Sequence, residues 1–279
     1  MASVLNLDES FDTISKEDLD FIKTQTGILN DQELKTHVIS VAEKAYKVFP
    51  FGCITRFLFL NGRMSHHFGY KRALELCSAQ PGAILMDIGC CMGTDVRKLA
   101  ADGVPFQNII ATDLRAEYWD LGHELFKSSP TSFPVPFVSA DVLGPSLISD
   151  VESLLAETTT PASEANTLDY HRNISVIHLS CLFHLFDEET QPRLIERLVA
   201  LLSSRPGSMI FGQEVGLERT GKLPFQIRER DVYCHSPESW KALWEGLFPG
   251  KVEVEAVLES TSLPEEGLGL WLNWCVIRK

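Results

Sequence analysis

One stretch of sequence, Ile84-Leu-Met-Asp-Ile-Gly-Cys-Cys-Met-Gly-Thr-Asp95, limits the possible folds of this chain more than any other. The apolar run from Ala83 to Ile88 leads into a turn with Gly89 and Gly93, and a helical pattern follows from Asp95 to Ala101. Glycine lets a backbone approach a ligand closely, and the first turn of a helix presents unpaired N–H groups. The stretch therefore predicts a β-turn-α unit with a ligand site at its turn.

Apolar runs and helical patterns alternate along the rest of the chain. The further strands are predicted at Asn108 to Thr112, Val135 to Ser139, Ile174 to Leu179 and Ser208 to Gly212. The helices are predicted at Glu117 to Lys127, Glu188 to Leu202 and Pro237 to Leu247. Such alternation is typical of an α/β protein with a doubly wound, mostly parallel sheet. The closing segments, Val252 to Leu258 and Leu270 to Ile277, have no helix between them, so we expect an antiparallel last strand in a seven-stranded sheet.

The beginning of the chain has a different character from the rest. Residues 1–80 show helical periodicity without a convincing strand, as in Asp31 to Val48, where apolar residues recur once per turn. We predict a helical N-terminal cap over residues 1–80 and an α/β core over residues 81–279. The polar stretch from Thr158 to Thr167 has no periodicity and contains proline, so it is expected to be an exposed loop or a disordered insertion.

Composition excludes several classes of protein. The 279 residues carry 25 Lys and Arg against 38 Asp and Glu, a formal net charge of −13, and we find no basic stripe, so nucleic acid is not an expected partner. No segment supplies the roughly 20 apolar residues of a membrane span. The start lacks the pattern of a secretory signal, which predicts a cytoplasmic protein with seven reduced cysteines. The Cys and His spacings match no zinc site, and no metal is expected.

Two more acids follow predicted strands. Asp113 ends the run Ile109-Ile-Ala-Thr-Asp113, and Asp141 ends the run Phe137-Val-Ser-Ala-Asp141. The carboxyl ends of parallel strands form the ligand crevice of open α/β sheets. There Asp113 can accept hydrogen bonds from both hydroxyls of a ribose, and Asp141 can accept one from an adenine amino group. Together with Asp87, three acids are predicted to meet at one edge of the sheet.

The residues Met86-Asp-Ile-Gly-Cys-Cys-Met-Gly93, Asp113 and Ala140-Asp141 resemble the class I S-adenosylmethionine-dependent methyltransferases. The strand pattern of the core, with its antiparallel last strand, is similar to their Rossmann-like fold. Three segments are more narrowly similar to fungal methyltransferases of polyketide-terpenoid (meroterpenoid) biosynthesis: Phe51 to Phe57, Asp113 to Phe126 and His235 to Trp240.

This resemblance implies S-adenosyl-L-methionine as the cofactor, S-adenosyl-L-homocysteine as its product, and no metal. The cofactor-binding residues that it implies are Asp87, Gly89, Cys91, Gly93, Asp113, Leu114, Asp141, Val142 and Leu179. Asp87, Gly89 and Gly93 are expected to line the methionine moiety. Cys91 stands at the central glycine of the family's turn, and this argues against a nicotinamide dinucleotide, because a pyrophosphate needs glycine at that position.

Polar and aromatic residues of the cap and of the fourth strand end are candidates for the acceptor site. Arg56 can bind an acidic substrate through two parallel hydrogen bonds, and His67 and Tyr70 lie in the polar segment from Ser65 to Tyr70. His184 follows the fourth strand and is a candidate general base, with His67 as the other.

The function that we predict is O-methylation of a small secondary metabolite, by methyl esterification of a carboxylate in a polyketide-terpenoid intermediate. A carboxylate is already ionised at neutral pH and needs no general base, whereas a phenolic or enolic hydroxyl of a polyketide profits from one. The alternatives are methylation of such a hydroxyl, a nicotinamide-dependent oxidoreductase, and a non-catalytic, cofactor-binding regulatory protein. The sequence leaves the oligomeric state open.

Overall fold

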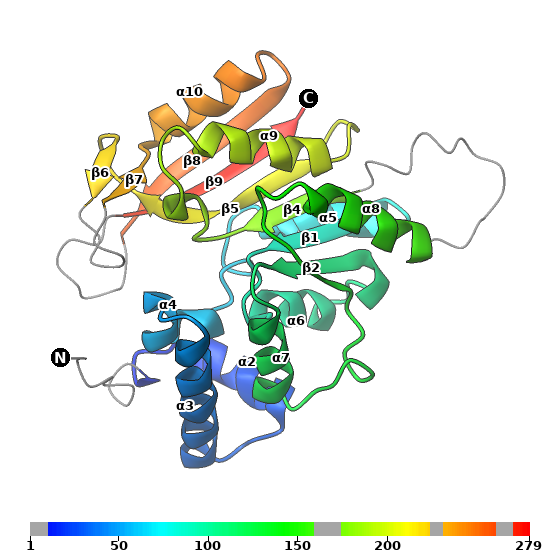
Figure 1. Cartoon of the computed structure of the whole chain (residues 1–279), viewed down its shortest axis with the longest axis vertical. Helices are drawn as coiled ribbons and strands as arrows, with labels where there is room; N and C mark the ends of the chain where they lie inside the picture. The colour runs from blue at the N-terminus through cyan, green and yellow to red at the C-terminus, as the bar shows by residue number, and fades with distance from the viewer. Residues whose placement is uncertain (1–10, 159–173, 224–230, 261–269) are drawn as a thin grey trace.

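The fold is built around a seven-stranded sheet (Figure 1). The structure is a computed structural model, and it describes residues 11–158, 174–223, 231–260 and 270–279. The strands of this sheet are β1 (Ile84–Ile88), β2 (Ile109–Asp113), β3 (Phe137–Ser139), β4 (Ile174–Leu179), β5 (Met209–Gly216), β8 (Val252–Glu259) and β9 (Leu270–Arg278). All seven were predicted from apolar runs, and their bounds agree to within a few residues.

The strand order is β3-β2-β1-β4-β5-β9-β8. The first five strands are parallel, and β9 pairs antiparallel with both β5 and β8. The predicted mostly parallel sheet with an antiparallel last strand is thus confirmed. The chain runs outward from β1 to β3 and then returns to β4 on the other side of β1. In such sheets the ligand crevice lies where the order reverses, at the carboxyl ends of the strands.

Helices cover both faces of this sheet. The helices α8 (Ser146–Thr158), α9 (Gln191–Leu201) and α10 (Pro237–Leu247) pack on one face, where Trp240 and Trp244 are buried. On the other face lie α5 (Tyr70–Ala79) and α6 (Thr94–Ala101), together with Trp119 of α7 (Ala116–Leu125). Helix α10 begins at Pro237 and is capped by Ser236, whose side chain accepts from the Ser239 N–H.

One helix and two short strands were not predicted. Helix α8 precedes the polar stretch that was expected to be irregular, and residues 159–167 of that stretch lie outside the described residues. The strands β6 (Gly221–Leu223) and β7 (Val232–Cys234) form a separate two-stranded sheet, which is too short to give a clear alternation in sequence.

The N-terminal helices form a layer of their own beside α7 (Figure 1). This layer contains α2 (Lys16–Thr26), α3 (Asp31–Val48) and α4 (Gly52–Thr55), and its core buries side chains such as Leu34 and Phe57 against Tyr118 of α7. Helix α5 lies within the predicted cap, residues 1–80, but packs on the sheet through Tyr70 and Ala73. The division at residue 80 stays a prediction.

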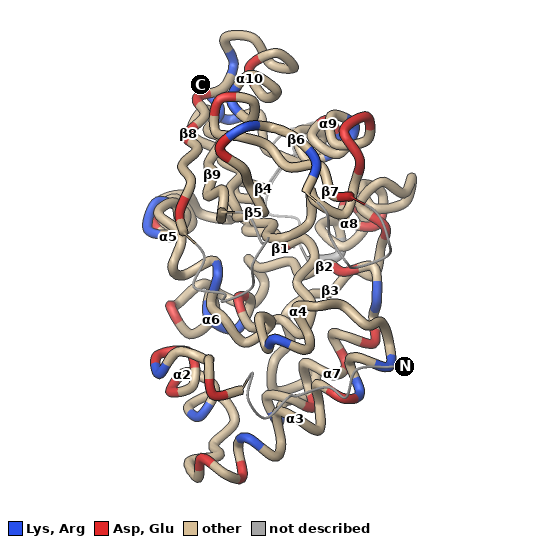
Figure 2. The backbone as a smooth tube through the Cα atoms, turned by 90° about the vertical axis from the view of Figure 1, so that its left-hand side faces the viewer, with Lys and Arg blue, Asp and Glu red and all other residues tan. Residues whose placement is uncertain are grey.

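Charged residues of both signs are mixed in the N-terminal layer. Basic and acidic residues are interspersed on α2 and α3, as Figure 2 shows. Among the described residues, no helix combines the length and the apolar character that crossing a membrane requires.

Candidate functional site

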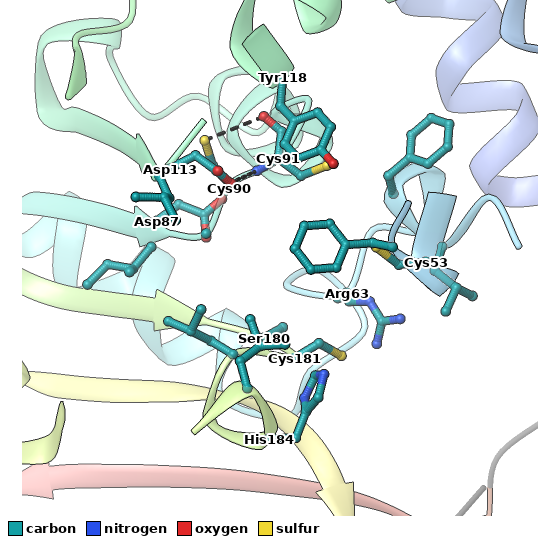
Figure 3. A pocket seen from close by; sticks show the side chains of 18 of the residues that line it. Cys53, Arg63, Asp87, Cys90, Cys91, Asp113, Tyr118, Ser180, Cys181 and His184 are labelled. Carbon is teal, nitrogen blue, oxygen red and sulfur yellow. Dashed lines mark hydrogen bonds between the residues drawn. The ribbon is translucent and has the colours of Figure 1, made fainter. Parts of the chain in front are cut away.

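A cavity of about 310 Å³ opens at the carboxyl ends of the parallel strands. Figure 3 shows Asp87 and Asp113 on one side of it, and Cys53, Arg63 and His184 facing them across the space. The first two come from β1 and β2, whereas Cys53 comes from α4 of the N-terminal layer. The cavity therefore lies between the sheet edge and the helices that precede the sheet, where the sequence predicted a ligand site.

The turn after β1 has a backbone that favours glycine. Gly89 has φ +76° and Cys91 has φ +50°, and the N–H groups of Gly89 and Cys90 both donate to the Thr112 carbonyl of β2. A Cβ atom on Gly89 would meet only Leu182 Cδ1, at 3.7 Å, and both residues line the cavity. The turn thus presents bare backbone to the cavity.

Asp113 is held in place by the backbone on both sides. Its Oδ2 accepts from the Cys91 N–H and its Oδ1 from the Arg115 N–H, both at 2.9 Å. Burial raises the pKa of this carboxyl above its ordinary value, although the two N–H donors act in the opposite direction. The next residue, Leu114, lines the cavity with 61% of its surface exposed. The predicted Asp113 and Leu114 thus come together at one end of the cavity.

Asp141 and Val142 also line this end, as predicted. Asp141 Oδ1 accepts from the Leu143 N–H at 2.9 Å, while Val142 is buried against the core. Strand β3 ends two residues earlier, at Ser139. The three acids that the sequence placed at successive strand ends therefore do line one cavity.

A buried chain of polar groups beneath the cavity escaped the sequence analysis. His178 Nδ1 lies 2.7 Å from Asp87 Oδ1, and His178 Nε2 lies 2.9 Å from Ser180 Oγ. All three residues line the cavity. The sequence did hold a signal, because His178 interrupts an otherwise apolar strand, and a buried histidine requires hydrogen-bond partners.

Asp95 adds a second, partly buried carboxylate at the start of α6. Its Oδ1 accepts from the Met64 N–H at 2.9 Å. Burial raises the pKa of Asp95 to about 6, with the Asp87 charge acting in the same direction.

His184 reaches the cavity from the turn after β4, where Glu214 orients it. Glu214 is 3% exposed, and its Oε1 accepts from the N–H groups of Leu182 and Phe183. Its other oxygen lies 3.1 Å from His184 Nδ1. The imidazole is therefore fixed through Nδ1 by a carboxylate from β5.

Three arginines line the cavity, Arg56 as predicted and Arg63 and Arg115 in addition. Arg63 Nη1 donates to Gln213 Oε1 at 2.5 Å, and its guanidinium lies 4.9 Å from the Trp271 ring centre. The contact between Arg63 and Gln213 joins residues 150 positions apart in the chain. Sequence patterns give no signal for a contact of that kind.

Cysteines form part of the same wall. Cys91, which was predicted to face the cofactor, does line the cavity, as do Cys53 and Cys181. Burial raises the pKa of Cys53 to about 11 and that of Cys181 to about 12, so these thiols are neutral at physiological pH. Among the described residues, no cluster of His, Cys, Asp or Glu has the arrangement of a metal site.

Four predicted site residues do not line the cavity. Gly93 packs under α7, where a Cβ atom would lie 2.7 Å from Trp119 Cζ3. Leu179 is fully buried in the core, because successive side chains of a strand point to opposite faces.

The other two, His67 and Tyr70, lie just before α5 and at its first position. His67 is 6% exposed and accepts the Gly69 N–H on Nδ1, and burial lowers its pKa to about 3. Tyr70 Oη donates to Asp102 Oδ2 at 2.6 Å. These four residues therefore do not form part of the cavity wall.

The order of the strands, the glycine turn after β1 and the acids at the strand ends belong to one crevice. Together they define the cofactor crevice of a Rossmann-like class I methyltransferase. A family model for the N-terminal domain of meroterpenoid methyltransferases matches residues 7–60. Methyltransferase ausD of Penicillium brasilianum is 30% identical over 231 residues, which cover 83% of this chain and 76% of that protein. Methyltransferase adrK of Penicillium roqueforti is 30% identical over 221 residues, which cover 77% and 70%.

O-methyltransferase atr3 of Stereocaulon alpinum is 34% identical over 242 residues, which cover 85% of this chain and 64% of that protein. The solved structure of magnesium protoporphyrin IX methyltransferase from Synechocystis aligns along the whole of both chains with 10% identity and a TM-score of 0.47. The chain belongs to the family of class I S-adenosylmethionine-dependent methyltransferases that includes ausD and adrK. An oxidoreductase is thereby set aside.

Proposed function

We propose that this protein transfers a methyl group from S-adenosylmethionine to a carboxylate oxygen of a small secondary metabolite, a polyketide-terpenoid intermediate. The observation that carries this proposal is a single cavity with carboxylates at one end and the guanidinium groups of Arg56 and Arg63 elsewhere on its wall. The family model for meroterpenoid methyltransferases supports a metabolite of this class, and the relatives named O-methyltransferase support an oxygen atom as the methyl acceptor.

The residues at the strand ends fit the proposed cofactor. Asp113 uses one lone pair of each oxygen for a backbone N–H, and the remaining lone pairs can accept a ribose diol. Leu114 and Val142 offer apolar surface to an adenine ring, and Asp141 keeps its Oδ2 for the exocyclic amine. The bare backbone at Gly89 leaves room that a side chain would fill.

The methionine part of the cofactor would lie near Asp87. This side chain is buried, and its Oδ1 is paired with His178 Nδ1, so its Oδ2 can accept a hydrogen bond from the amino group of the ligand. When bound, S-adenosylmethionine supplies an electrophilic methyl group on a positively charged sulfur.

The protein's own contribution is to bring the acceptor oxygen into line and to exclude water. Phe51, Phe59 and Leu185 give the wall an apolar surface, and the N-terminal layer closes the cavity over the sheet edge. Holding two reactants in attack geometry supplies about 7 to 11 kcal/mol of a reaction barrier at most. An ionised carboxylate therefore needs orientation more than it needs a base.

One observation favours a second candidate function, the methylation of a phenolic or enolic hydroxyl. His184 is oriented by the buried Glu214, as a general base is in other enzymes, and it faces the cavity. A phenol has a pKa near 10 and would use such a base.

The test is methyl transfer from cofactor labelled in the methyl group to matched pairs of aromatic and terpenoid compounds. Each pair holds a free carboxylic acid and the corresponding phenol, and mass spectrometry locates the label. We expect label in methyl esters that alkaline hydrolysis releases as methanol, and no transfer by Asp113→Ala. Label in alkali-stable ethers would support the hydroxyl acceptor instead. Cofactor binding without transfer to any compound of the panel or of a fungal metabolite extract would support a non-catalytic regulatory protein.

A further inference from the structure

We propose that Arg63 is a carboxylate-binding residue of this cavity, which Gln213 holds in position. Two carboxylates could meet it, the amino-acid end of the cofactor and the acid group of the acceptor. The second source rests on the proposed function, whereas the first requires only cofactor binding.

The guanidinium of Arg63 has no direct ion-pair partner among the described residues, where no Asp or Glu oxygen lies within ion-pair distance of it. The charge of Asp95 acts on it only over a longer distance. Its partners there are a neutral amide, Gln213, and the ring of Trp271. An arginine carries five N–H donors in one plane, so most of them remain for a ligand. A cation of this kind in a cavity wall points to an anion from outside the chain.

The orientation of Gln213 is fixed by a chain of hydrogen bonds across three strands. Glu259 is an acceptor only, so the Asn273 amide nitrogen faces it, at 2.8 Å. Asn273 Oδ1 therefore accepts from Gln213 Nε2 at 2.9 Å, which turns Gln213 Oε1 toward Arg63. The guanidinium is thus placed before any ligand binds, and such preorganisation favours binding.

The ring of Trp271 restrains the guanidinium further. A guanidinium that stacks on an aromatic ring keeps its edge available for two parallel hydrogen bonds to a carboxylate. Arg63 also lines the cavity together with Asp87, Ser180 and Trp271. Both the methionine end of the cofactor and an acceptor near β9 are consistent with that position.

The experiment measures carboxylate-dependent binding by calorimetry in the full chain and in Arg63→Gln. In the cofactor arm, S-adenosylhomocysteine is compared with 5′-methylthioadenosine, which lacks the amino-acid end. In the acceptor arm, benzoate is compared with neutral benzamide on the protein saturated with S-adenosylhomocysteine. The matched control is Arg72→Gln, which removes an exposed arginine of α5 that does not line the cavity.

We expect Arg63→Gln to lower the affinity for one of the two carboxylate ligands at least tenfold. The affinity for the neutral counterpart of that ligand should not change. A loss confined to S-adenosylhomocysteine assigns Arg63 to the cofactor, and a loss confined to benzoate assigns it to the acceptor. Equal affinities of the full chain and Arg63→Gln for both carboxylates, or equal losses for the neutral compounds, would overturn the proposal. Because these are binding measurements, failure of the proposed methyl transfer would leave their outcome intact.

Gln213→Leu and Gln213→Glu test the positioning role. Leu leaves the guanidinium without its acceptor, so carboxylate affinity should fall severalfold while the neutral ligands bind normally. Glu supplies an internal carboxylate that competes for Arg63, so the loss should be larger than for Leu. A merely structural Gln213 would change the carboxylate and neutral ligands alike, and that result would contradict its assignment.

Discussion

Asp87 and His178 lie side by side on β1 and β4 and form a buried pair, with 2.7 Å between Asp87 Oδ1 and His178 Nδ1. Burial alone lowers the pKa of His178, but the charge and the hydrogen bond of Asp87 outweigh it and raise that pKa above its ordinary value. The pair therefore favours the protonated form of a histidine in the cavity wall.

Replacing Asp87 by Asn should reverse the direction of this shift. Without the Asp87 carboxylate, burial outweighs the smaller effect of the Asp95 charge, so the pKa of His178 should fall below its ordinary value of about 6.5. A histidine with a raised pKa stabilises the fold below its unfolded pKa, and this contribution is lost as the pH rises through the folded pKa. Asp87→Asn should thus lose more stability near pH 6 than near pH 8.5. NMR titration of nitrogen-labelled histidine checks the pKa, and an unchanged His178 titration would contradict the assignment.

Gly89→Ala should weaken cofactor binding at least tenfold in a folded protein. The added Cβ would lie in the cavity, and the left-handed backbone costs about 1 to 2 kcal/mol for a residue other than glycine. Gly82→Ala is a matched control, because Gly82 has φ +77°, has no heavy atom within 4 Å of its would-be Cβ, and lies outside the cavity. Calorimetry with S-adenosylhomocysteine should separate the two variants, and equal affinities would show that the turn is structural only.

Asp113→Ala should lower the affinity for the cofactor at least tenfold and should also lower the free energy of unfolding of the protein. Hydrogen bonds to charged groups contribute about 1.5 to 3 kcal/mol, and the loss of the carboxylate leaves two backbone N–H groups without their acceptor. The measurements are calorimetric titration and thermal melting, with Asp120→Ala on the exposed side of α7 as the control. Unchanged cofactor affinity would remove Asp113 from the site.

His67→Phe should make stability less dependent on pH. Burial lowers the pKa of His67 to about 3, so the stability it contributes is present above its unfolded pKa and is lost as the pH falls below about 6.5. Between pH 7 and pH 5 the variant should lose about 2 kcal/mol less than the unmodified protein. Urea unfolding at both pH values measures this difference, and His66→Gln, an exposed neighbour, should show no such change.

His184→Gln distinguishes the two acceptor types. A carboxylate with a pKa near 4 should be methylated at nearly the same single-turnover rate by both proteins from pH 6 to pH 8. A phenolic acceptor would instead lose about 100- to 10,000-fold, the usual contribution of a general base. The affinity for S-adenosylhomocysteine is measured in parallel, so that a packing defect is recognised. A hundredfold loss with intact binding and an ether product would make His184 the base.

Sequence patterns predicted the central strands well because a strand that is covered on both faces reads as a mostly apolar run, as β1 does, whereas the edge strand β8 alternates. They also predicted Asp87, Asp113 and Asp141 at one cavity, since parallel strands share the edge at which they end. They did not predict which residues line the cavity where this depends on the direction of a side chain. Leu179 points into the core while its neighbours His178 and Ser180 line the cavity.

The wall opposite the acids could not be predicted for a different reason. Arg63 and Gln213 come from distant parts of the chain, and neither lies in a motif. His67 belongs to a polar segment, yet it is buried beside Phe211 of β5. Its burial depends on how α5 packs against the sheet, and local periodicity carries no information about such packing.

The position of β9 between β5 and β8 has a consequence for the order in which the protein assembles. Within the sheet, β8 touches β9 alone, so it has no place to pair until β9, which is later in the chain, has been synthesised. The strands that carry Asp87 and Asp113 have all their neighbours well before that moment. During synthesis the half of the cavity that holds the acids can therefore form first. The half that holds Trp271 is completed only when the last strand inserts, so a newly made chain should form the edge with the acids before the wall with Trp271.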